Sequence, residues 1–136
     1  MEELGMTGLL ADNIGVLGML DLVLGDVNDA RLHLRRAMDL TVEAGSEMGI
    51  AQMLLGVALL AQAEGRHERA ARLLGAQARI QETLGGAPPP ELLAPFGDPE
   101  ADARTALDDE TFERAWAKGR AMTTEEAVAY ALEEEG

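Results

Sequence analysis

The chain has 136 residues, of which 47% are apolar, and carries a formal net charge of −14. This size and apolar content suffice for one domain with a core of its own. The acidic charge argues against a nucleic-acid partner, because binding to a phosphate backbone depends on clustered Lys and Arg. The absence of cysteine excludes disulfides and Cys-ligated zinc.

The apolar composition favours helices. One Trp, one Tyr and two Phe are the aromatic residues of the chain, and all lie in its last third. Ala and Leu dominate over the β-branched Val and Ile, which suits close-packed helices better than strands. The sequence therefore predicts an all-α fold.

A spacing of forty residues recurs through the first part of the chain. It relates Gly5 to Gly45 and Gly85, Gly25 to Gly65, Ala11 to Ala51, Ala30 to Ala70, and Leu34 to Leu74. Repeats of this length bury their apolar faces by stacking on their neighbours. We therefore expect an α-solenoid built of helical hairpins with a period of about forty residues.

In chain order, residues 1–85 predict two helical hairpins. Their helices are expected over residues 7–24, 27–44, 47–64 and 67–84, and they end at Gly25, Gly45, Gly65 and Gly85. Glycine marks these ends because it adopts the left-handed cap conformation at little cost. Asp26 is expected to accept hydrogen bonds from the free amides of the second helix.

The first helix is apolar on nearly every side. Leu10, Ile14, Leu17, Leu20 and Leu24 recur at three- and four-residue intervals and are expected to face the hairpin partner. Outside this stripe the helix carries a second apolar set, Leu9, Val16, Met19, Leu22 and Val23. Such a patch usually marks an interface. We therefore expect a homodimer joined through the N-terminal helices.

Residues 86–99 read as a linker rich in Pro and Gly, and residues 100–136 as short helices that pack on the repeats. These helices are expected over residues 100–107, 109–119 and 123–134, the last opened by a capping box of Thr123 and Glu126. Phe112 and Trp116 lie four residues apart and are expected to form the core of this part, with Trp116 mostly buried. A ligand-stacking platform is the alternative for this pair.

The spacing within the first hairpin is that of a tetratricopeptide repeat: Leu17-Gly18, Gly25, Ala30, Leu34 and Ala37 stand at its packing positions. The second copy departs from the motif at Ala58 and Gln77. Residues 66–132 resemble the C-terminal helical region of bacterial regulators that join a STAND-type ATPase to tetratricopeptide-like repeats, often beside a LuxR-type DNA-binding domain. The strings at residues 68–76, 84–89 and 111–122 carry this resemblance, and the departure is the segment 95–99.

The resemblance implies a non-catalytic protein-interaction or regulatory module in signal transduction. The alternative is a sensor that binds a small-molecule inducer on the concave face of the repeats. No Gly-x-x-x-x-Gly-Lys-Ser/Thr phosphate loop occurs, so the ATPase of such regulators is not expected here.

The two histidines, His33 and His67, lie at partly apolar positions of the repeat. We expect both to pack between helices, because no motif indicates the partner and pocket that a catalytic base needs. Asp26, Asn28 and Asp29 lack the spacing of a calcium loop and are expected to cap a helix. No catalytic residue, cofactor or metal site is predicted.

Arg66, Arg69 and Arg72 are expected to form local ion pairs with Glu64 and Glu68, and a carboxylate-rich partner is the alternative. Residues 108–110 are acidic and are expected to cap the helix that follows.

The N-terminus lacks a secretory signal, and the most apolar run, residues 15–25, is too short to cross a bilayer. A cytoplasmic protein without a membrane partner is expected.

Overall fold

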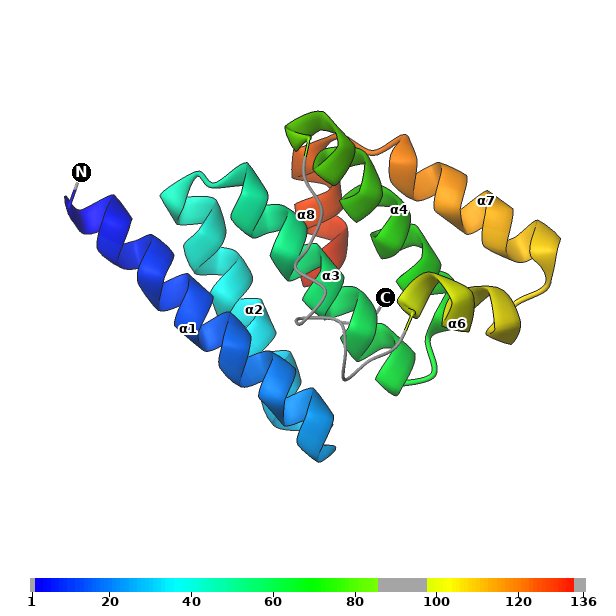
Figure 1. Ribbon diagram of the computed structural model, residues 1–136, viewed down its shortest axis with the longest axis horizontal. Coiled ribbons are helices and arrows are strands. Elements are labelled where there is room, and N and C mark those ends of the chain that lie inside the picture. Colours follow the sequence, from blue (N-terminus) through cyan, green and yellow to red (C-terminus); the bar gives the residue numbers. More distant parts are fainter. Residues whose placement is uncertain (1, 86–97, 134–136) are drawn as a thin grey trace.

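The computed structural model describes residues 2–85 and 98–133, and for residues 2–9 and 12 it describes the backbone alone. Every regular element in these ranges is an α-helix (Figure 1). The helices are α1 (Glu2–Leu24), α2 (Val27–Ala44), α3 (Glu47–Ala63), α4 (His67–Leu84), α6 (Pro99–Ala106), α7 (Asp109–Arg120) and α8 (Thr124–Leu132). The predicted all-α class is confirmed for the described part of the chain.

The turns between the first four helices lie where the glycines predict them. Gly25, Gly45, Gly65 and Gly85 all have φ between 73° and 85°, the left-handed region that glycine adopts without a steric cost. α1 begins at Glu2 instead of residue 7. The glycines at positions 5 and 8 lie inside this helix, because a single glycine weakens a helix without breaking it.

The caps agree with the sequence at most helix starts. The Oγ of Ser46 accepts from the amide of Gly49 at 3.0 Å, and Thr123 and Glu126 form the predicted capping box. Hydrogen bonds from the side chain of Thr111 and from its backbone amide lower the pKa of the Asp108 carboxyl group, which caps α7. The expectation for Asp26 is wrong. It stands before α2, but its side chain makes no capping hydrogen bond.

α3 is the central helix of the fold. α1 and α2 form one antiparallel hairpin, α3 and α4 form the next, and α7 lies along the far side of α4 (Figure 1). From Gly49 to Ala61 every residue of α3 except Gln52 is buried. The core therefore runs on both sides of α3, against α2 and α4.

The C-terminal helices pack on the second hairpin. The predicted linker lies outside the described residues over 86–97, whereas Asp98 caps α6 and Pro99 begins it. Phe112 is fully buried and stacks on Trp116, which is partly buried. Arg120 donates to both carboxylate oxygens of Glu82 at 2.9 and 3.0 Å, which lowers the pKa of Glu82 and ties α7 to α4.

Two glycines bring the backbones of α4 and α7 together. A Cβ atom on Gly119 would overlap the backbone carbonyl of Arg72, and one on Gly75 would overlap that of Trp116. No side chain fits at either position, so the two helices cross with backbone against backbone. This contact fixes the C-terminal helices on the second hairpin.

Gly119→Ala should lower the free energy of unfolding by about 3 kcal/mol, because the added methyl group overpacks a contact with a backbone that cannot yield. Urea unfolding followed by circular dichroism measures the loss. The neighbouring exposed residue provides the control, since Lys118→Ala should change stability by less than about 0.5 kcal/mol. Equal effects of the two substitutions would contradict the close crossing.

Candidate functional site

α1 packs on α2 through its smallest residues. Ala11, Gly15 and Gly18 are buried, and a Cβ atom on Gly18 would lie 2.8 Å from Cγ of Leu34. Small residues let two helices approach closely. The prediction that Leu10, Leu17, Leu20 and Leu24 face the hairpin partner is therefore wrong. Of the predicted stripe, only Ile14 packs against the core.

Those leucines lie instead on the opposite side of α1, together with two valines. This outer face of α1 comprises Leu10, Val16, Leu17, Leu20, Val23 and Leu24, whose exposed fractions range from 45% to 74%. All six side chains are apolar. A group of exposed apolar side chains on one side of a helix is typical of a protein interface.

The outer face contains only some of the interaction residues that the sequence predicted. Val16 and Val23 belong to it, each more than half exposed. Met19 and Leu22 are partly buried and pack against the core, and the side chain of Leu9 lies outside the described residues. Periodicity alone could not assign these residues, because apolar side chains surround α1.

The forty-residue repeat relates the outer face to an interface inside the molecule. The counterparts of Leu17 and Leu20 on α3 are Val57 and Leu60, which are buried. These two residues line a cavity with Leu34 of α2. α1 therefore exposes the positions through which α3 packs on the preceding hairpin.

A small apolar groove lies between α1 and α3. It has a volume of about 100 Å³ and is lined by Gly15, Val16, Met19, Leu34, Gln52, Met53 and Gly56. Its polar lining side chain is Gln52. The two methionines are flexible and polarisable, which suits an apolar ligand of variable shape.

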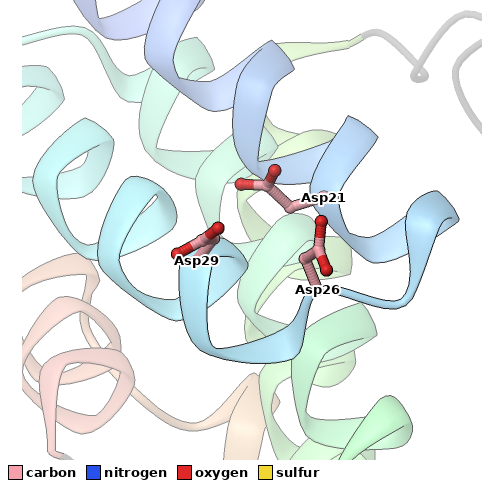
Figure 2. Close-up of side chains that lie close together, drawn as sticks. All are labelled: Asp21, Asp26 and Asp29. Atoms are coloured by element: carbon pink, nitrogen blue, oxygen red, sulfur yellow. The ribbon is translucent and has the colours of Figure 1, made fainter.

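Three carboxylates gather at the turn between α1 and α2. Figure 2 shows Asp21, from the end of α1, with Asp26 and Asp29; one oxygen atom of each lies within 4.8 Å of the others. Nδ1 of His33 lies 2.5 Å from Oδ2 of Asp21. Calcium takes about six to eight oxygen ligands, and three exposed or half-buried carboxylates do not make such a shell. The absence of a metal site stays a prediction.

Like charges this close repel one another, and Asp26 makes no side-chain capping bond that would offset the repulsion. Asp26→Asn should therefore raise the melting temperature, more at low than at high salt because ions screen the repulsion. Asp39→Asn makes the same change of net charge at an exposed position of α2 and serves as the control. A larger gain at Asp39, or a rise in the melting temperature of the parent protein on adding calcium, would contradict this interpretation.

The remaining polar residues predicted from the sequence lie on α2, α4 and the turn before α4. His33 is partly exposed beside Asp21, and His67 is partly buried at the start of α4. Nε of Arg66 lies 4.0 Å from Glu64, as expected for a local ion pair. Arg69 is buried, and its Nη2 donates instead to the backbone carbonyl oxygens of Ala131 and Glu133.

Comparison with known proteins relates the chain to regulators. Over 107 residues it is 33% identical to proteins of Mycobacterium bovis and of two strains of Mycobacterium tuberculosis that are named as HTH-type transcriptional regulators. The match covers 79% of this chain and 12% of each regulator. No protein-family model matches the chain, and no solved structure does.

The match shows that the chain is related to transcriptional regulators. It covers most of this chain, whereas the chain spans only about an eighth of the length of each regulator. Among the described residues, none of the helices combines the length and the apolar character that crossing a bilayer requires.

Proposed function

We propose that this chain is a non-catalytic protein-interaction module of a regulatory protein, and that the outer face of α1 is its interaction surface. Its relatives support a regulatory role, since they are named as transcriptional regulators. The observation that carries the interaction surface is the exposure of six apolar side chains on one side of α1.

We infer that the two hairpins are tetratricopeptide-like repeats. The forty-residue spacing of the turn glycines and the buried small residues at Gly18, Ala30 and Ala37 support this assignment. In such arrays each hairpin packs on its neighbours and buries its apolar sides against them. The outer face of α1 is apolar, so a partner covers it.

For this chain alone, the proposed partner is a second copy. The six residues of the outer face carry no charge, so two copies that join there bring apolar side chains together without burying a charge of these six residues. On the other side of the molecule, α7 covers α4 (Figure 1). The arrangement favours a two-fold dimer in which α1 meets α1, the commonest closed symmetry.

The double substitution Leu17→Glu with Leu20→Glu should convert the dimer to a monomer, because it places four charges in the joined faces. We expect the dissociation constant to rise at least about 100-fold, since each buried unpaired charge costs several kcal/mol. Light scattering across a dilution series measures this constant. Circular dichroism should show an unchanged helix content, because both leucines are about half exposed in the monomer.

Leu32→Glu is the matched control. Leu32 is also an exposed leucine, at 67%, but it lies on α2 outside the outer face of α1. A parent protein that stays monomeric at micromolar concentration would refute the homodimer. So would a dimer that Leu32→Glu weakens as much as the double substitution does.

A second candidate function, the binding of a small-molecule inducer, is favoured by the groove between α1 and α3. At about 100 Å³ the groove could accept a short alkyl chain or one small ring. The chemical class that fits is an apolar molecule with one polar group that reaches Gln52.

Nuclear magnetic resonance of methionine methyl groups tests this second candidate. Titration with phenol should shift the methyl signals of Met19 and Met53 in a saturable way, because both side chains line the groove. Met38 is fully buried and does not line it, so its methyl signal is the internal control. Shifts that do not saturate, or that are equal for Met38, would exclude the groove as a ligand site.

A further inference from the structure

A hollow at the start of α4 gathers cationic side chains in this acidic protein. It has a volume of about 490 Å³, and its lining includes Arg66, His67, Arg69 and Arg72, with Leu107 and Tyr130 on the opposite wall. The second hairpin supplies the cations, and the C-terminal helices supply the wall. The hollow therefore exists only when these helices are packed on the hairpin.

Arg69 places a buried charge beside this hollow, and no carboxylate among the described residues pairs with it. Its exposed fraction is 8%, and its Nη2 donates to Ala131 O and Glu133 O, both at 3.0 Å. Its Nη1 is buried and has no acceptor among the described residues. Buried charged donors are nearly always satisfied in folded proteins, so this arrangement calls for an acceptor.

Two neighbours of Arg69 repeat the pattern. Nε of Arg72 and Nδ1 of His67 are also buried, and neither has a hydrogen-bond partner in the described part of the chain. Cζ of Arg69 and Cζ of Arg72 each lie 4.8 Å from the ring centroid of Tyr130. Contact with an aromatic ring holds a guanidinium group in place but does not satisfy its N–H donors. The two arginines are thus positioned for an acceptor that the described residues do not supply.

The first turn of α4 adds backbone donors. α4 begins at His67, and the residue before it, Arg66, makes no side-chain capping bond to the helix. The first amides of a helix point away from it and carry the positive end of its dipole, which favours a bound anion. The residues of this first turn, His67, Glu68 and Arg69, line the same hollow as Arg72.

The carboxylates near the hollow do not neutralise the positive charge of Arg69 and Arg72. Glu64 pairs with Arg31 and Arg66, whereas Glu68 lines the hollow at an exposed position. Within residues 2–85 and 98–133 neither Arg69 nor Arg72 forms an ion pair with a carboxylate. The expectation of local ion pairs is therefore wrong for these two arginines, and it holds for Arg66.

We propose that the hollow binds the phosphate group of a small molecule. Arg72 and the first-turn amides of α4 donate to the phosphate oxygens, and Arg69 supplies positive charge beside them. Phosphate suits the site because several donors converge from different directions on one compact anion. The net charge of −14 opposes a long nucleic acid, so the ligand is a small phosphorylated compound. This site is independent of the outer face of α1.

Titration with inorganic phosphate at constant ionic strength tests the proposal. Amide resonances of His67, Glu68 and Arg69 should shift in a saturable way, and calorimetry should give the same dissociation constant. Arg72→Gln should weaken binding about tenfold, the usual effect of removing a hydrogen bond to a charged group. Arg114→Gln removes the same charge from an exposed position on α7 and should change binding less than twofold.

Two further measurements make the outcome decisive. Malonate, a dicarboxylate, should bind at least about tenfold more weakly than phosphate at the same ionic strength. The double substitution in the outer face of α1 should leave phosphate binding unchanged. Absence of saturable shifts, equal losses in the Arg72 and Arg114 variants, or equal affinity for malonate would each overturn the proposal. Circular dichroism checks that each variant is folded. If Arg72→Gln does not fold, Arg72→Lys is tested in its place, and it should also weaken phosphate binding because lysine lacks the planar donor pair of arginine.

Discussion

Close approach of helix backbones at small residues is the constraint on which this fold depends. The chain contains few aromatic side chains, so large rings cannot fill space between distant helices. Gly18 instead lets α1 settle onto Leu34, and the pair of Gly75 and Gly119 lets α4 and α7 touch through their backbones. Short distances between helices replace large side chains as the source of packing contacts. Where the helices approach one another in this way, small residues form the interior surface.

This choice of interior residues explains the surface of α1. Because alanine and glycine fill the contact with α2, most of the leucines and both valines of the same helix lie outside it. Helix packing also determines the surroundings of Arg69 and Arg72 on α4. Tyr130 and the last carbonyl groups of α8 occupy the space around Arg69 and Arg72, so local carboxylates do not reach them. Both candidate surfaces are therefore by-products of how neighbouring helices pack.

The sequence predicted the fold better than it predicted the faces of the helices. The turn at Gly45, for example, follows from local chemistry, because a left-handed residue at a helix end favours glycine whatever surrounds it. The orientation of α1 does not follow from local chemistry. Apolar residues cover all sides of this helix, so the sequence does not distinguish Leu17 from Gly18 as the interior residue. The contact of Gly18 with Leu34 of α2 decides it.

The candidate hollow was beyond sequence reasoning for a related reason. Arg72 lies four residues after Glu68, which is a usual spacing of an ion pair on a helix. The pairing fails because α8, some sixty residues later, provides Tyr130 and two carbonyl acceptors. Residues this distant are brought together by tertiary packing alone, and no local pattern in the sequence records the contact.

The covering of α4 by α7 has a consequence for solubility. Leu74 holds the repeat position of Leu34, through which α2 meets α3. In this molecule Leu74 and the neighbouring Gly75 lie beside Trp116 of α7. In the part of the chain that the structure describes, α7 therefore covers the side of α4 that corresponds to this packing surface. Head-to-tail addition builds open filaments when two different surfaces complement each other. If α1 is the association surface proposed above, its outer face cannot pack on α4 of a second molecule without displacing α7, which favours a closed dimer over a filament.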